Sequence, residues 1–372
     1  MDRDTFFRFY GSEVSYFTGK VRPALRVKRI PHADIVATPR VYREVIRPRT
    51  GLGFIPVVVT PEGDTWQDTS EILDALEARF PEPALYPQKP LQRVVAYLWE
   101  LYADEFLIAP ALHYRWSFPE SVTKARADFA ATNGDPEMAG KFADRMSSVL
   151  PGVGVVPETI PAFEAHVAEL LDDLERHLER HPYLLGGKPS LADCALMGPM
   201  YAHLYLDAVP GRMLRERALR TCHWIERMNH PDPDDMGDWL AGDAVAETMR
   251  PMLARMARDA GPYVLDTVRA FEEWADQHRA DGDEPPRGVG FHQTTLRGIG
   301  FGRYTSPYTL WMLQRVLDAY RALWPGDRAA VDRALEGTGC AAFLAYAPRH
   351  RLEKRGFKLA FARAPRDTRA HG

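Results

Sequence analysis

One short stretch, residues 53–73, constrains the fold of this chain more than any other: GFIPVVVTPEGDTWQDTSEIL. Three valines after Pro56 are typical of a strand, a turn rich in Pro, Gly and Asp follows, and residues 65–67 form a second short strand. Proline donates no hydrogen bond to a strand ladder, so Pro56 indicates a sheet edge or a cis bond after Ile55. The stretch predicts a β-hairpin with an exposed backbone edge.

A helix is expected directly after this hairpin. Asp68 and Thr69 lie where the helix begins, and Ile72 and Leu73 start its apolar stripe. A helix N-terminus offers unpaired amides and partial positive charge, which bind carboxylates. The sequence therefore predicts an exposed backbone edge beside an anion-binding helix end. The alternatives are an ordinary helix cap for the Asp-Thr pair and an edge-strand proline for Pro56.

The composition is that of an ordinary globular protein. The 372 residues suffice for two domains, and 45% are hydrophobic and 26% charged. A net charge of −4 argues against a nucleic-acid binder. Three scattered cysteines argue against a disulfide framework or a metal site. The first residues do not form a signal peptide, and no apolar run approaches the ~18 residues that cross a bilayer. We expect a cytoplasmic protein that binds no metal, nucleic acid or membrane.

Changes in composition along the chain predict its domains. Residues 1–82 mix short strands and helices, which indicates a small sheet covered by helices, and residues 83–90 form a proline-rich linker. Residues 91–230 show helical periodicity almost throughout. Residues 231–372 form a mostly helical extension packed on the helical domain, with a convincing helix from Ser306 or Pro307 and a basic tail that alternates like a strand.

A capping motif marks one helix of the second domain. In the sequence PSLAD, Ser190 is placed at the N-cap and Asp193 at the third helical position. The carboxylate reaches back to the cap amide, which is the geometry of a capping box.

The chain resembles the cytosolic glutathione transferase superfamily, with three motifs in the right order: Ile55-Pro56, Asp68-Thr69 and the capping box at residues 190–193. The resemblance implies a thioredoxin-like α/β N-terminal domain followed by an all-α C-terminal domain. It also implies that glutathione is the co-substrate and that the protein is a homodimer. In that family Pro56 is cis, the Ile55 backbone pairs with the cysteinyl part of glutathione, and Asp68 and Thr69 hold the γ-glutamyl end.

The resemblance also indicates where the catalytic group lies. Aligning Lys20-Val21-Arg22 with the family pattern places Ser15 at the position of the catalytic serine or cysteine. A hydroxyl beside a helix N-terminus stabilises the glutathione thiolate. Tyr16, which replaces a frequent proline, is the nearest rival donor, and an ordinary helix cap is the alternative for Ser15. Pro23 favours a helix that starts near residue 19 or 20, since proline disrupts helix interiors.

The second substrate is expected between the domains. The stretch LHYRWSF ends a long helix with an aromatic cluster that suits a flat, apolar electrophile. Candidate lining residues are His113, Tyr114, Arg115 and Trp116, and helix-end packing is the alternative.

The leading interpretation is an enzyme that conjugates glutathione to a small apolar electrophile. Glutathione-dependent ether cleavage or dehalogenation uses the same thiolate and is the alternative among enzymes. A non-catalytic binding or assembly module is the third, favoured by the altered Ser-Tyr loop and the long extension.

Overall fold

The N-terminal part is built on a four-stranded sheet. The structure, a computed structural model, describes residues 6–280 and 282–363. The strands are β1 (Phe7–Gly11), β2 (His32–Val36), β3 (Val57–Val59) and β4 (Thr65–Gln67), in the order β2-β1-β3-β4. Strand β1 runs parallel to β2 and antiparallel to β3, and β3 and β4 form the predicted hairpin. This is the mixed sheet of a thioredoxin-like domain.

The helices of this part are α1 (Tyr16–Val27), α2 (Pro39–Val41), the π-helical turn η2 (Tyr42–Ile46), α3 (Arg47–Thr50) and α4 (Thr69–Arg79). Helix α1 begins earlier than Pro23 led us to expect, and the proline lies inside it. Nearly every side chain of α1 is buried, and the helix packs on α10 (Leu191–Pro199). Tertiary packing therefore outweighs the local cost of the proline.

The second part is helical. Its elements are α5 (Pro90–Tyr102), η3 (Ala103–Leu107), α6 (Ile108–Trp116), α7 (Pro119–Asn133), α8 (Pro136–Ser147), η4 (Pro151–Val153), α9 (Ile160–Leu178), α10, η5 (Met200–Tyr205), α11 (Ala208–Arg217) and α12 (Leu219–Asn229). The capping box predicted for α10 is confirmed: the Ser190 amide donates to Asp193 over 3.0 Å. The exact domain limits stay a prediction.

The C-terminal extension combines helices with two hairpins. Its elements are η6 (Pro233–Asp235), η7 (Ala241–Asp243), η8 (Glu247–Met249), α13 (Arg250–Arg255), η9 (Met256–Ala260), α14 (Gly261–His278), β5 (Phe291–Leu296), β6 (Ile299–Tyr304), α15 (Pro307–Arg321), α16 (Pro325–Ala334), α17 (Ala341–Leu344), β7 (Leu352–Arg355) and β8 (Lys358–Phe361). Strands β5 and β6 pair with each other, as do β7 and β8. The β5–β6 hairpin was not predicted from the sequence.

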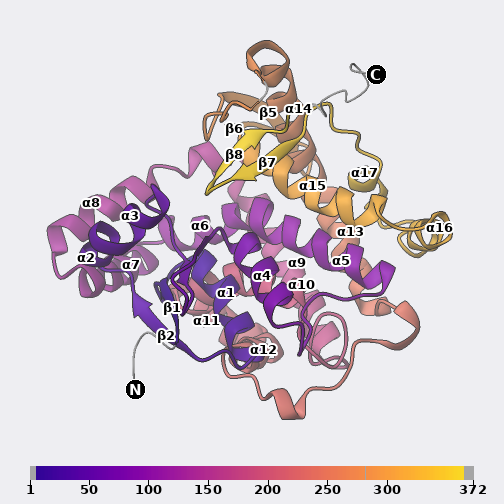
Figure 1. Ribbon diagram of the computed structural model, residues 1–372, viewed down its shortest axis with the longest axis horizontal. Coiled ribbons are helices and arrows are strands. Elements are labelled where there is room, and N and C mark those ends of the chain that lie inside the picture. Colours follow the sequence, from indigo (N-terminus) through magenta and orange to yellow (C-terminus); the bar gives the residue numbers. More distant parts are fainter. Residues whose placement is uncertain (1–5, 281, 364–372) are drawn as a thin grey trace, which may run out of the picture.

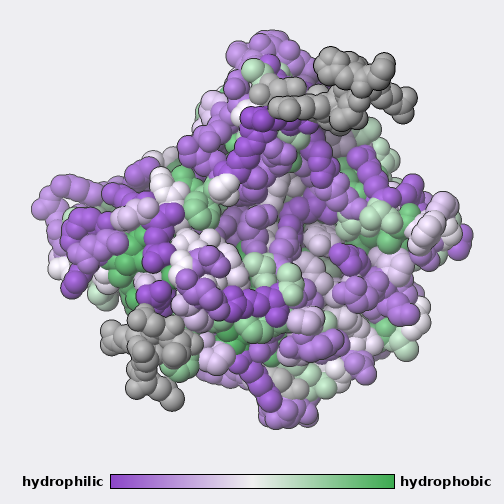
Figure 2. Space-filling view, viewed as in Figure 1, coloured by the Kyte–Doolittle hydropathy of each residue, from purple (hydrophilic) through white to green (hydrophobic). Residues whose placement is uncertain are grey.

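One continuous hydrophobic core joins all three parts. It contains Phe9 of the sheet, Trp99 of the helical part, and Leu313 and Phe361 of the extension, each buried. In Figure 1 α14, α15 and the two hairpins of the extension lie above α5 and α9 of the helical part, and the β7–β8 hairpin, in yellow, points toward the N-terminal part. The face in Figure 2 is mostly hydrophilic, with hydrophobic side chains in separate patches. No helix in the described part of the chain is long and apolar enough to span a bilayer.

Candidate functional site

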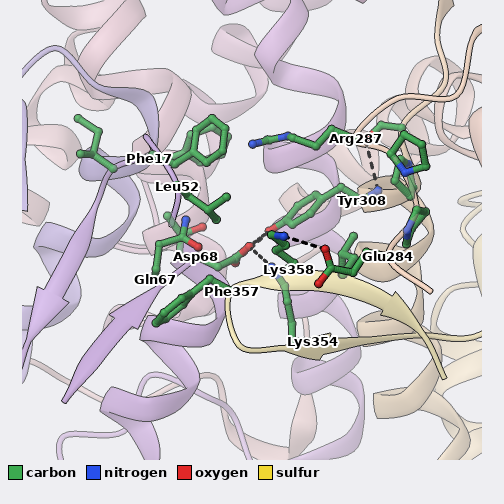
Figure 3. A pocket seen from close by; sticks show the side chains of 18 of the residues that line it. Phe17, Leu52, Gln67, Asp68, Glu284, Arg287, Tyr308, Lys354, Phe357 and Lys358 are labelled. Carbon is green, nitrogen blue, oxygen red and sulfur yellow. Dashed lines mark hydrogen bonds and ion pairs between the residues drawn. The ribbon is translucent and has the colours of Figure 1, made fainter. Parts of the chain in front are cut away.

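A cavity of about 590 Å³ lies between the N-terminal part and the extension. Figure 3 shows it between the N-terminal strands and the β7–β8 hairpin. Its wall is formed by loops before β3 and α4 on one side and by three segments of the extension on the other. The lining residues are Phe17, Leu52, Phe54, Ile55, Pro56, Gln67, Asp68, Thr69, Glu284, Pro285, Pro286, Arg287, Ser306, Pro307, Tyr308, Lys354, Phe357, Lys358 and Leu359.

The four residues predicted to hold glutathione all line this cavity. The Ile55–Pro56 peptide bond is cis, as expected. Ile55 lies just outside the ladder of β3, which begins at Val57. Asp68 is the N-cap of α4 with φ of 78°, and its carboxylate accepts the Ser70 amide over 3.1 Å. The hairpin and the helix N-terminus thus form one continuous wall.

The extension contacts the same wall directly. Lys354 Nζ lies 2.7 Å from Asp68 Oδ2, and the Tyr308 hydroxyl lies 3.0 and 2.9 Å from the two carboxylate oxygens of Asp68. Burial and the neighbouring Asp68 hold the pKa of Tyr308 well above its usual value, so its phenol acts as the donor. Sequence reasoning did not name these two residues, because nothing local indicates that α15 and β7 reach the N-terminus of α4.

Five charged side chains face the cavity, and the bases outnumber the acids. They are the acids Asp68 and Glu284 and the bases Arg287, Lys354 and Lys358. Lys358 pairs with Glu284 over 2.8 Å. Within the described part of the chain no carboxylate pairs with Arg287, whose guanidinium lies 3.8 Å from the ring centroid of Phe54. One positive charge therefore remains without an acidic partner, which favours an anionic ligand.

Apolar side chains form the rest of the wall. Phe17, Leu52 and Phe54 come from the N-terminal part, and Phe357 and Leu359 come from the β7–β8 hairpin. A wall of this kind, with a few polar groups at one end, suits a ligand with both an apolar and a charged portion.

The two candidate catalytic residues, Ser15 and Tyr16, differ in burial and in hydrogen bonding. Ser15 is the half-buried N-cap of α1, two residues before the cavity-lining Phe17, and its hydroxyl accepts the Thr18 amide over 3.3 Å. The Tyr16 side chain is buried, and its hydroxyl donates to the Ala103 carbonyl over 2.6 Å. Burial and nearby Asp104 raise the pKa of Tyr16 well above its usual value. Neither side chain belongs to the cavity wall.

The four residues predicted for the second-substrate pocket are not brought to this cavity. His113, Tyr114, Arg115 and Trp116 are all buried in α6. Arg115 pairs with Asp207 over 2.7 Å and donates to backbone carbonyls on either side. Helix-end packing, the alternative for this cluster, describes their environment.

A buried polar network lies behind the site. Lys20 Nζ lies 2.6 Å from Asp104, 2.8 Å from Glu100 and 3.0 Å from the Ser70 hydroxyl. Arg315 of the extension reaches Glu100 over 3.1 Å. Burial raises the pKa of Asp104 to about 7, against the effect of Lys20. Burial would also raise the pKa of Glu100, but Arg315 and Lys20 lower it to about 2. The network joins all three parts of the chain.

Metal-ligating residues form no cluster in the part of the chain that the structure describes. In residues 6–280 and 282–363, no three His, Cys, Asp or Glu side chains are grouped to hold a metal ion. Cys194, Cys222 and Cys340 are all buried and free.

The chain is a two-domain protein in which a thioredoxin-like domain is joined to a helical domain, with a cis-proline and a helix N-terminus in one cavity. Residues 9–84 match the glutathione S-transferase N-terminal domain, and residues 157–218 match the glutathione S-transferase C-terminal domain. The chain belongs to the glutathione S-transferase superfamily.

Three of the solved structures that resemble the chain are the following. Beta-etherase LigF from Sphingobium sp. strain SYK-6 is 19% identical, with a TM-score of 0.44 over 61% of this chain and 96% of that one. A glutathione S-transferase from Methylobacterium radiotolerans, in complex with glutathione sulfonate, is 19% identical (TM-score 0.39; 65% and 100%). One from Rhodospirillum rubrum F11 is 17% identical (TM-score 0.42; 65% and 97%). No curated protein sequence matches the chain.

Proposed function

We propose that this protein binds glutathione in the cavity, activates its thiol as the thiolate and conjugates it to a small apolar electrophile. The observation that carries the proposal is that Ile55, cis-Pro56, Asp68 and Thr69 line one wall. The Ile55 backbone is free of the β3 ladder to pair with a peptide, and the α4 N-terminus attracts a carboxylate. Glutathione is a peptide with a carboxylate at each end, which matches both features.

The apolar wall supports the choice of electrophile. Phe54 and Phe357 both line the cavity, one from the N-terminal part and one from the extension. An apolar substrate between them is desolvated beside the place where the thiol would lie. The electrophile would therefore lie under the β7–β8 hairpin rather than at the end of α6, where the candidate residues are buried.

Ser15 is the proposed catalytic donor. It lies at the N-cap of α1, where a hydroxyl and the helix terminus together lower a thiol pKa. Tyr16 is the weaker candidate, since its hydroxyl is already bonded to Ala103. The homodimer implied by the family and the cytoplasmic location both stay predictions, and sedimentation analysis tests the first.

Calorimetric titration with glutathione, followed by turnover measurements with model electrophiles, tests the function. Thr69→Ala removes the hydroxyl at the helix N-terminus and should weaken binding by about 1–3 kcal/mol. Thr69→Ser keeps the hydroxyl and should bind almost like the native protein. Binding without turnover would favour a non-catalytic module, and turnover of ethers or halides alone would favour those chemistries. Absence of glutathione binding would contradict the proposal.

A further inference from the structure

Lys354 lies against the carboxylate of Asp68, the group that the proposed glutathione complex assigns to a ligand ammonium. In the proposed glutathione complex, the Asp68 carboxylate pairs with the γ-glutamyl ammonium. Here Asp68 already accepts hydrogen bonds from the Ser70 amide, the Tyr308 hydroxyl and Lys354 Nζ. A carboxylate has room for about four such bonds. A ligand ammonium at Asp68 would therefore bind beside an ammonium group of the protein itself.

Lys354 is held in this position by more than one contact. Its Nζ lies 4.7 Å from the ring centroid of Trp311 and 5.2 Å from that of Tyr308, both on α15. Its side chain is 11% exposed and that of Asp68 is 9% exposed, so water screens the pair only weakly. Figure 3 shows Lys354 rising from β7 toward Asp68 and Tyr308. A lysine fixed by two rings and a carboxylate does not readily yield its place to a ligand.

Lys354 therefore has opposite effects on a ligand ammonium and on a ligand carboxylate. An ammonium beside Asp68 is repelled by Lys354, whose charge already neutralises the carboxylate. A carboxylate at the α4 N-terminus is attracted both by the helix end and by Lys354. Specificity is the difference between the affinities for two ligands. One lysine is therefore enough to reverse the preference at this end of the site, from a ligand with both an ammonium and a carboxylate to a ligand with the carboxylate alone.

We infer that Lys354 is a specificity-determining residue, and that the cavity prefers a glutathione-like thiol whose γ-glutamyl end carries the carboxylate without the ammonium. The ligand class is a glutaryl-type or similar acyl-cysteinyl peptide, anionic at both ends. This inference rests on the proposed glutathione-type function of the same cavity. It assigns a role to the extension, which supplies both Lys354 and Tyr308.

The test compares two ligands, glutathione and N-glutaryl-cysteinylglycine, which differ only in the ammonium group. Calorimetric titration of the native protein at neutral pH should show the des-amino ligand binding about tenfold more tightly or better. Lys354→Met keeps the apolar stem over Trp311 and removes the charge. It should tighten glutathione binding and weaken binding of the des-amino ligand, so that the preference reverses.

Lys358→Met is the matched control. Lys358 lies on the same hairpin and lines the same cavity, but its partner is Glu284. This variant should leave the ratio of the two affinities near its native value. Equal affinities, or a native preference for glutathione, would overturn the inference while leaving the glutathione-binding function in place. Failure of both ligands to bind the native protein would overturn the proposed function as well. The native comparison needs no variant, so a misfolded Lys354→Met does not weaken the test.

Discussion

Lys20 Nζ lies 2.6 Å from Asp104 Oδ2, and neither side chain is more than 1% exposed. The pair connects α1 of the sheet domain to the turn after α5, and Arg315 joins it from the extension through Glu100. Buried charges are tolerated only when each has a partner, because removing them from water costs several kcal/mol. The network therefore makes the stability of the three parts interdependent.

Replacing Lys20 tests this interdependence. Lys20→Met leaves Glu100 and Asp104 buried without their shared cation, and we expect a loss of about 3–5 kcal/mol in the free energy of unfolding. Urea denaturation measures it. Lys141→Met is the control, because Lys141 pairs with Glu137 while 76% exposed, and such surface pairs contribute about 1 kcal/mol or less. Similar losses in the two variants would show that the buried network does not connect the parts.

The same network predicts a pH dependence of stability. The pKa of Asp104 rises from 3.8 to about 7 on folding, so the folded state holds a proton that the unfolded state releases. This contribution is complete below pH 3.8 and is lost as the pH rises through about 7. Stability should fall by up to about 1.4 kcal/mol per pH unit in that window.

Asp104→Asn isolates the contribution of this carboxyl. The amide cannot titrate, so the difference in unfolding free energy between the native protein and the variant should change between about pH 4 and 7 in favour of the variant. Urea midpoints at several pH values measure it. A constant difference over this range would show that Asp104 does not take up a proton on folding.

Local patterns in the sequence predict local parts of the site, and only those. The proline-entered strand and the Asp68-Thr69 helix start lie within twenty residues of each other, so spacing alone brings them together. The capping box at Ser190 depends on the same short range and is confirmed. The contact of Lys354 with Asp68 spans 286 residues, and periodicity identifies a buried face without identifying what covers it.

The position of Tyr16 shows a second limit to what the sequence predicts about the site. The sequence supplies a phenol at the right place in the chain, but the helix begins at Tyr16 itself. Its side chain therefore packs against His203 and bonds to Ala103 of the helical part. The sequence gives the residue type of a donor, whereas the direction of its side chain depends on where the helix starts. Pro23 suggested that this helix starts later than it does.

Ser15→Ala tests the proposed catalytic donor. Loss of the hydroxyl should raise the pKa of bound glutathione, leave its affinity almost unchanged and slow turnover by about 100-fold or more. Ultraviolet absorbance of the thiolate, followed against pH, measures the pKa. Tyr16→Phe is the matched comparison, since it removes a hydroxyl one residue away that bonds to Ala103. A shift with Tyr16→Phe alone would place the donor at Tyr16, and no shift in either variant would favour a non-catalytic module.

Arg287 is expected to bind the second carboxylate of the peptide. A ligand with one end at the α4 N-terminus and its middle along Ile55 extends toward Phe54, over which the Arg287 guanidinium lies. Arg287→Ala should weaken glutathione binding by about 1–3 kcal/mol, since charge-assisted hydrogen bonds are of this strength. The loss should shrink at high salt, because Arg287 is exposed and salt screens exposed charges.

Arg333→Ala is the matched control. It removes the same charge from an exposed position on α16, outside the cavity wall, and the variant should bind glutathione like the native protein. Equal affinities of the Arg287 and Arg333 variants would show that the peptide does not extend to Phe54, and that its free carboxylate lies elsewhere.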